Sequence, residues 1–291
     1  MRSETEMMYQ ILQTAREDDR IRAVILNGSR VNPNIEPDIF QDYDIIYVVT
    51  DVAPFYNNTE WIKRFGEMMI MQMPDLMEDP PVDTTRRFAY LMQFADGNRI
   101  DLTIYAADRL DELKEDSLSI TLLDKDGILA PFPEPSEASY LPKPPTAEEF
   151  AHSVNEFWWV CPYAAKGLWR KEMLYARQTI DVYLRKQLMQ MLTWYVGTRT
   201  DFKVNVGKAG SRFETLLPEE MWDLLMQTYA GAEYGETWDA LIAMTKLFRM
   251  AAKPVAEHFG FVYHHEEDDK VSAHLRHVRQ LPADAEEMYQ E

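Results

Sequence analysis

Two aspartates separated by one residue are the part of this chain best suited to chemistry. Asp42 and Asp44 stand at the start of an apolar run that extends to Thr50. Because side chains alternate between the two faces of a strand, both carboxylates must point to the same side. Carboxylate oxygens are the ligands that hard divalent cations such as Mg²⁺ prefer. The pair therefore predicts a metal site at the start of a strand.

A Gly28-Ser29 turn precedes this strand and closes another apolar run, Ile21–Leu26. Free backbone N–H groups in such a turn can cradle a phosphate, although Ser29 can equally serve only to cap the turn. A turn beside same-side carboxylates suits Mg²⁺ and a nucleoside triphosphate. Neither a Walker-type Gly-x-x-x-x-Gly-Lys-Ser/Thr loop nor a Rossmann Gly-x-Gly-x-x-Gly is present, which argues against kinases and dehydrogenases of those kinds.

A third aspartate, Asp101, stands in a β-like run that extends from Arg99 to Tyr105. This run follows Arg87–Ala95, and Asp96-Gly97-Asn98 between them predicts a hairpin turn. An isolated Asp-x-Asp is more often a solvated strand end than a metal site. The upstream turn and the third strand-borne carboxylate together reverse that judgement.

Composition limits the classes of function. The 291 residues carry a formal net charge of −19, so the chain should repel nucleic acids and attract small cationic partners, although the acidity can also serve only solubility. The single cysteine, Cys161, excludes an internal disulfide framework and a cysteine-based zinc site. No apolar run of about 18 residues occurs, so we expect no membrane span and a cytoplasmic protein.

The elements that must position these residues follow from apolar spacing and capping signals. Ser3-x-x-Glu6 is a capping box that opens a helix to about Glu17. Further along the first half we expect a helix over Glu60–Gln72, a helix over Asp108–Glu115 and a strand over Ser119–Asp124. Six prolines make 131–145 the expected linker between domains at 1–135 and 146–291.

The second half reads as helical. A capping box at Thr146 predicts a helix to Trp158 or Trp159 that breaks at Cys161-Pro162. The expected remainder is a long amphipathic segment over Tyr163–Val196, helices over Pro218–Ala230 and Thr237–Phe259, and a polar, mobile tail from His264. The chain is therefore expected to be α+β, with a mixed β-sheet and flanking helices followed by an α-helical bundle.

The Gly28-Ser29 turn, Asp42-x-Asp44 and Asp101 together resemble the pattern of the nucleotidyltransferase superfamily. Further blocks are similar to the streptomycin (aminoglycoside 6-) adenylyltransferases, over nearly the whole chain: Asn155–Val160, Ala165–Arg170, Met191–Gly197, Val206-Gly207-Lys208 and Arg212-Phe213-Glu214. The resemblance implies a nucleotidyltransferase-type catalytic domain, with a helical domain that binds the substrate. It also implies transfer of AMP from ATP to the 6-hydroxyl of streptomycin, with release of pyrophosphate and antibiotic resistance.

The resemblance assigns roles to the singled-out residues. Asp42 and Asp44 would hold one or two Mg²⁺ ions, and Asp101 would either bind the metal or act as the general base for the acceptor hydroxyl. The residues expected to contact the triphosphate are Gly28, Ser29, Arg30, Lys208 and Arg212.

Streptomycin carries two guanidinium groups, which carboxylates and aromatic faces attract. The candidates in the helical half are Glu156, Trp158, Trp159 and Asp181. We expect a monomer that binds the aminoglycoside and ATP, with no nucleic-acid or membrane partner. Two alternatives stay open: the same fold acting on another small-molecule or protein hydroxyl, or a non-catalytic nucleotide-binding module.

Overall fold

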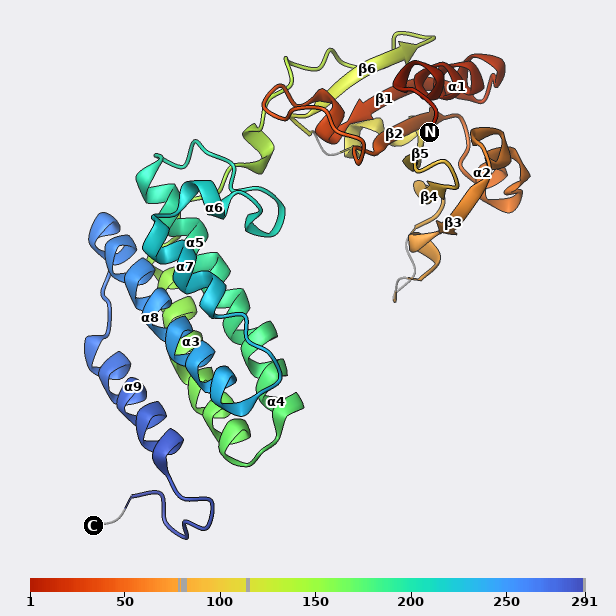
Figure 1. Cartoon of the computed structure of the whole chain (residues 1–291). Helices are drawn as coiled ribbons and strands as arrows, with labels where there is room; N and C mark the ends of the chain where they lie inside the picture. The colour runs from red at the N-terminus through yellow and green to blue at the C-terminus, as the bar shows by residue number, and fades with distance from the viewer. Residues whose placement is uncertain (78, 80–82, 114–115, 290–291) are drawn as a thin grey trace. The chain divides into compact units, whose positions relative to one another are not determined.

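A computed structural model describes residues 1–77, 79, 83–113 and 116–289. The chain divides into two compact units, Met1–Ser139 and Tyr140–Glu291, and the division falls inside the proline-rich segment 131–145. Figure 1 shows a sheet with short helices in the first unit and a helical bundle in the second. The α+β class expected from the sequence is confirmed.

A mixed sheet forms the framework of the first unit. Its strand order is β3-β4-β5-β2-β1-β6. The strands are β1 (Ile21–Asn27), β2 (Tyr43–Val49), β3 (Met68–Gln72), β4 (Arg87–Phe94), β5 (Arg99–Ala106) and β6 (Ser119–Asp124). β2 pairs with β5 in parallel, and the other neighbours pair antiparallel. The predicted hairpin is present as β4 and β5.

Helix α1 (Glu4–Glu17) has the predicted capping box, in which Ser3 and Glu6 bond each other's backbone N–H groups. Its buried residues Met7 and Ile11 belong to the same core cluster as Tyr47 of β2, whose hydroxyl donates to the Ile11 carbonyl at 2.6 Å. The short helix α2 (Ala53–Asn57) adds Phe55 to that cluster. The core thus fixes the β2 backbone from which the aspartates project.

The expected helix over Glu60–Gln72 is wrong. Only Glu60–Phe65 is helical, as a 3-10 turn, and Met68–Gln72 is the strand β3. Gly66, at φ +127°, ends the turn, and pairing with β4 then outweighs the helical spacing of the methionines. The helix expected over Asp108–Glu115 is a 3-10 segment, Ala107–Glu112, and Glu115 lies outside the described residues.

The second unit buries a large apolar core between helices. They are α3 (Ala147–Trp169), α4 (Met173–Gln178), α5 (Arg185–Arg199), α6 (Phe213–Leu216), α7 (Glu219–Gln227), α8 (Tyr234–Phe259) and α9 (His265–Gln280). A π-helical turn, Thr179–Leu184, joins α4 to α5. In the part of the chain described here, no helix is both long and apolar enough to cross a membrane.

Two expected boundaries in this unit are wrong. α3 continues through Pro162, because buried residues on both sides of it, such as Trp158, Cys161 and Ala165, hold the helix in the core. Proline removes only one backbone donor, and this burial compensates for the loss. The chain turns instead at Lys171, which has a φ of +60°, so the long segment expected over Tyr163–Val196 is divided.

The tail from His264 is not mobile as expected but forms α9. Leu275 and Val278 are buried in the core, and so is the carboxylate of Asp268. Arg249 of α8 bonds both Asp268 oxygens, and the Tyr263 hydroxyl donates to the same carboxylate at 2.8 Å. A buried charge with these partners anchors the helix, which the acidic run alone does not reveal.

Candidate active site

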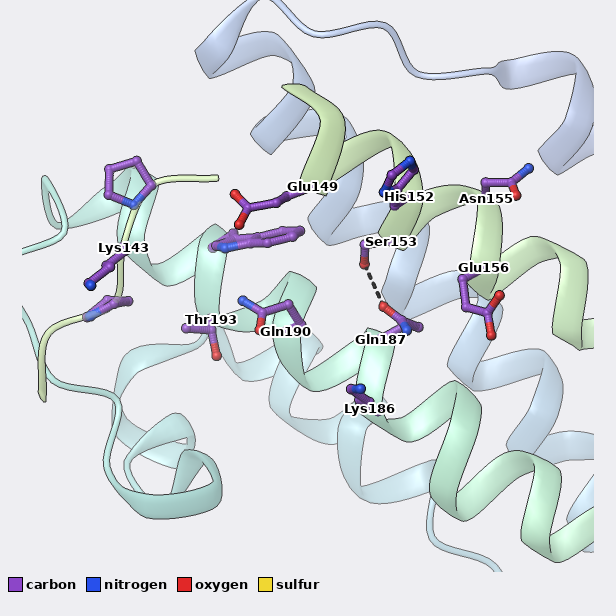
Figure 2. A pocket seen from close by; sticks show the side chains of 13 residues that line it. Lys143, Glu149, His152, Ser153, Asn155, Glu156, Lys186, Gln187, Gln190 and Thr193 are labelled. Carbon is purple, nitrogen blue, oxygen red and sulfur yellow. Dashed lines mark hydrogen bonds between the residues drawn. The ribbon is translucent and has the colours of Figure 1, made fainter. Parts of the chain in front are cut away.

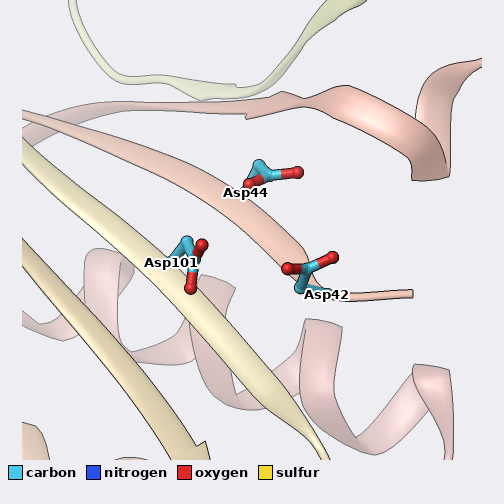
Figure 3. A group of neighbouring side chains, drawn as sticks. All are labelled: Asp42, Asp44 and Asp101. Atoms are coloured by element: carbon cyan, nitrogen blue, oxygen red, sulfur yellow. The ribbon is translucent and has the colours of Figure 1, made fainter. Parts of the chain in front are cut away.

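Asp42, Asp44 and Asp101 come together on one side of the sheet, as Figure 3 shows. Asp44 of β2 and Asp101 of β5 are direct partners in the parallel pairing, and Asp42 lies one residue before β2 begins. One oxygen from each carboxylate lies within 4.8 Å of the others. Two strands that are distant in sequence therefore build a three-carboxylate cluster.

Asp44 is the innermost member of this cluster. Burial raises its pKa to about 6, and the neighbouring charges of Asp42 and Asp101 add to the increase. Mutual repulsion of this kind is relieved by a bound cation. Three hard oxygen donors at this spacing fit a divalent metal ion such as Mg²⁺, so the residues present suit the expected cofactor.

Gly28 is the point where the turn touches the carboxylates. Its φ is +79°, and a Cβ placed there would lie 2.2 Å from Oδ2 of Asp44. Its N–H donates to the Leu118 carbonyl at 3.0 Å, which fixes the first turn of the 3-10 segment Gly28–Val31. Glycine is required here both for its backbone conformation and for the close approach. Ser29 follows directly and is partly exposed.

Arg30 does not present its guanidinium to the solvent side of the site, as a phosphate contact would require. Its side chain is only 8% exposed and stacks on Tyr43 at 3.7 Å. Its nitrogens donate to the backbone carbonyls of Asp42 and Gln41 at 2.9 and 2.7 Å. Arg30 is thus a strut that holds the entry to β2, and the expected phosphate role is corrected to positioning of Asp42.

Arg99 is a member of the site that sequence reasoning missed. Its Nε and Nη2 donate to the two oxygens of Asp101 at 2.7 Å each, and Nε also lies 3.4 Å from Oδ2 of Asp42. The sequence already indicates this contact, because Arg99 and Asp101 are two residues apart on a strand and so share a face. Asn27 was missed as well. It pairs in register with Asp44 and accepts a hydrogen bond from Ser119 at 2.9 Å.

The expected triphosphate contacts from the second half lie in a loop of the second unit. Lys208 follows Gly207, and the loop has three residues with positive φ, Gly207, Ala209 and Gly210. Arg212 donates to the Asn205 carbonyl at 3.3 Å. These contacts lie within the second unit, so the triphosphate contacts of Lys208 and Arg212 remain predictions.

Glu156 lines a cavity of about 890 Å³ between α3 and α5. Figure 2 shows Glu149, His152, Asn155 and Glu156 on one helix, facing Lys186, Gln187, Gln190 and Thr193 on the other. Ser153 and Gln187 bond each other across the helix pair at 3.0 Å. The lining combines two glutamates, two lysines and several amides with prolines and the indole of Trp194. Sequence reasoning found Glu156 but missed its partners.

The other three expected substrate residues do not share this cavity. Trp158 is 2% exposed and lies in the core, in edge-to-face contact with Phe157, so it has little surface to offer a ligand. Trp159, 64% exposed, lines a separate cavity of about 500 Å³ near Glu267 and Lys270 of α9. Asp181 is paired with Arg177 at 2.8 Å and lines neither cavity. Trp158 also borders this second cavity, although its side chain is almost entirely buried.

Comparison with known proteins covers nearly the whole chain. The family described as streptomycin adenylyltransferase matches residues 1–278. An aminoglycoside 6-adenylyltransferase of Bacillus subtilis (strain 168) is 40% identical over 265 residues, which cover 90% of this chain and 93% of the relative. A protein of the same name from Campylobacter jejuni is 39% identical over 264 residues, 90% of this chain and 91% of the relative.

A solved structure also matches. The crystal structure of an aminoglycoside 6-adenyltransferase from Bacillus subtilis is 33% identical and aligns over 97% of this chain and 100% of its own, with a TM-score of 0.47. The sequence comparisons carry the classification.

Proposed function

The chain belongs to the streptomycin adenylyltransferase family, and from that premise we propose that it transfers AMP from ATP to the 6-hydroxyl of streptomycin, with release of pyrophosphate. The modified drug would lose its fit to its target, which gives resistance. The observation that carries the proposal is the convergence of Asp42, Asp44 and Asp101 on one side of the sheet. Nucleotidyl transfer needs such a centre, because charge develops on the attacking and leaving oxygens together.

Asp42 and Asp44 would hold the metal, as one or two Mg²⁺ ions. When bound, Mg²⁺ supplies positive charge that stabilises the attacking and leaving oxygens of the displacement. Asp44 contributes its charge fully above its pKa of about 6. The Arg30 strut and the core around β2 keep these two carboxylates in place before substrate arrives.

Asp101 is the candidate base for the acceptor hydroxyl and a candidate third ligand. The two bonds from Arg99 hold its carboxylate in one orientation. As the base, the Asp101 carboxylate would take the hydroxyl proton as the new O–P bond forms. The Gly28-Ser29 turn would contact the β- and γ-phosphates, with Ser29 as the donor because the Gly28 N–H is bonded to the Leu118 carbonyl. Lys208 and Arg212 would add positive charge.

The cavity between α3 and α5 is the proposed acceptor site. Glu149 and Glu156 are seven residues apart on α3, two helical turns, so both face the same side. Two carboxylates spaced along a helix suit a substrate with two guanidinium groups, and Gln187 and Gln190 can bond its hydroxyls. The volume of about 890 Å³ lies within the usual range of small-molecule sites.

A panel of acceptors tests the proposal. The protein is incubated with ATP, Mg²⁺ and streptomycin, spectinomycin or kanamycin, and pyrophosphate is measured. We expect release with streptomycin and none with kanamycin. Absence of release with all three would sink the resistance function and leave another acceptor hydroxyl or a non-catalytic binder. Undiminished release by Asp42→Asn or Asp44→Asn would sink the metal assignment.

A further inference from the structure

Arg99 occupies a special place beside the carboxylate cluster. It begins β5 two residues before Asp101, and the same face of the strand carries both side chains. The Nε and Nη2 atoms of its guanidinium donate to the two oxygens of Asp101 at 2.7 Å, and Nε lies 3.4 Å from Oδ2 of Asp42. One guanidinium therefore bridges two of the three carboxylates that make up the proposed metal centre.

Arg99 offsets part of the negative charge of the cluster. Three carboxylates lie together, with one oxygen of each within 4.8 Å of the others, and the Arg99 guanidinium contacts two of them. The guanidinium thus relieves the same repulsion that a metal ion would relieve.

We propose that Arg99 is a tethered counter-ion that competes with the divalent metal for the oxygens of Asp101 and Asp42. The two cations seek the same lone pairs and repel each other at this range. Metal binding then requires the guanidinium to give up its contact with Asp42 and the hydrogen bond from its Nε to Asp101. The proposal rests on the metal centre of the proposed function.

The competition has a use in the reaction. A bare cluster of three carboxylates would hold a metal ion tightly between turnovers. With Arg99 in place the metal binds weakly alone and firmly when the phosphates of ATP supply further ligands. Arg99 would thereby couple metal binding to nucleotide binding and ease the departure of the metal with pyrophosphate.

Binding of Mn²⁺ alone tests this. The full-length wild-type protein, Arg99→Gln and Arg99→Lys are titrated, and free Mn²⁺ is followed by electron paramagnetic resonance. Arg99→Gln should bind Mn²⁺ about tenfold more tightly, and Arg99→Lys, which keeps the charge but loses the fork, should lie between it and the wild type. Equal or weaker binding by Arg99→Gln, or Arg99→Lys as tight as Arg99→Gln, would overturn the proposal.

Arg109→Gln is the matched control. Arg109 is an arginine of the same unit, similarly exposed and paired with Glu112 rather than with the cluster, so its replacement should leave Mn²⁺ affinity unchanged. Asp42→Asn distinguishes a failure of the metal centre from a failure of the role of Arg99. If the wild type and Asp42→Asn bind Mn²⁺ alike, the metal centre itself fails. If Asp42→Asn loses binding while Arg99→Gln equals the wild type, only the role of Arg99 fails.

A measurement on the wild type removes any dependence on the folding of Arg99→Gln. In protein labelled with ¹⁵N-arginine, the Nε–H signal of Arg99 is identified by its loss in Arg99→Lys. Saturating Mg²⁺ should speed its exchange with water, because the guanidinium leaves its carboxylate partners. An unchanged exchange rate under conditions where Mg²⁺ binds would contradict the competition.

Discussion

At the scale of single residues, the cluster is defined by charges that would separate if the sheet did not hold them. The raised pKa of Asp44 reflects both its burial and the two neighbouring carboxylates. Arg99 bonds the Asp101 carboxylate, and Arg30 bonds the backbone carbonyl of Asp42. Perturbed ionisation of this kind is typical of functional sites.

Replacing Gly28 with alanine tests how closely the turn is fitted to Asp44. The new Cβ would lie 2.2 Å from Oδ2, so the carboxylate must move, and we expect kcat/KM to fall about 100-fold. Gly97→Ala is the matched control, because Gly97 also has a positive φ, +90°, but an added Cβ there meets nothing within 4 Å. Its kinetics should be those of the wild type. Equal losses in both variants would mean that backbone strain alone matters.

The raised pKa of Asp44 gives a prediction for stability. A carboxyl whose folded pKa lies above its unfolded value costs no stability below the unfolded pKa of about 3.9, and the penalty is complete above about 6. Asp44→Asn in EDTA should therefore unfold at a higher temperature at pH 7.5, by roughly 2–5 °C, and at the wild-type temperature near pH 4. Thermal melts at the two values check this, and a pH-independent difference would contradict it.

At the scale of elements, parallel pairing of β2 with β5 is what joins the two halves of the site. Capping boxes and the hairpin turn are local signals, and the structure confirms α1, the β4–β5 hairpin and the start of α3. Segments governed by distant contacts were mispredicted. β3 forms because β4 offers it a partner, and α9 because Arg249 offers one to Asp268.

Arg2 ties α1 to the turn between β4 and β5. Its Nε donates to Asp96 at 2.7 Å, its Nη1 to Gln10 at 2.7 Å and to the Phe65 carbonyl. Hydrogen bonds from Arg2 hold the pKa of Asp96 well below its usual range. Arg2→Ala should therefore lower the free energy of unfolding by about 2 kcal/mol at pH 7.5.

A depressed carboxyl pKa stabilises above the unfolded value and loses its effect as pH falls, so the difference between Arg2→Ala and the wild type should shrink steadily below pH 4. Urea unfolding of both proteins at pH 7.5 and below pH 4 measures this difference in the free energy of unfolding. Lys63→Ala, which breaks an exposed pair with Glu60, should cost less than about 0.5 kcal/mol. An equally small loss of unfolding free energy in Arg2→Ala would contradict a stabilising role for the Arg2 hydrogen bonds.

At the scale of the whole molecule, the chain folds into two units with separate cores. Asp42 and Asp44 could be predicted from the sequence because strand alternation places them on one face, and Asp101 because its strand context resembles the family pattern. The pairing of β2 with β5 that brings Asp101 beside Asp44 could not be predicted. The helical residues could not, since a helix places charges around a full circle and only packing decides which face is open. Glu156 lies in a cavity for this reason, whereas Trp158 is buried and Asp181 is paired with arginine.

This division predicts separate kinetic effects. Glu156→Gln should raise KM for streptomycin about tenfold, because a charged hydrogen bond to a guanidinium is lost, while KM for ATP stays unchanged. Glu148→Gln is the control on the same helix, since Glu148 is highly exposed and does not line the cavity. Steady-state kinetics in which each substrate is varied in turn measures the two KM values. An equal effect of the two variants would remove the cavity from acceptor binding.

Transfer of label from ATP to streptomycin tests the central claim most directly. ATP labelled with ³²P in the α- or the γ-phosphate is incubated with Mg²⁺, streptomycin and either the wild type or Asp42→Asn, and the drug is isolated. The wild type should place α-label on streptomycin with equimolar pyrophosphate and never γ-label, and Asp42→Asn should transfer neither. Label from the γ-phosphate on the drug, or α-label that persists in Asp42→Asn, would contradict nucleotidyl transfer at this carboxylate cluster.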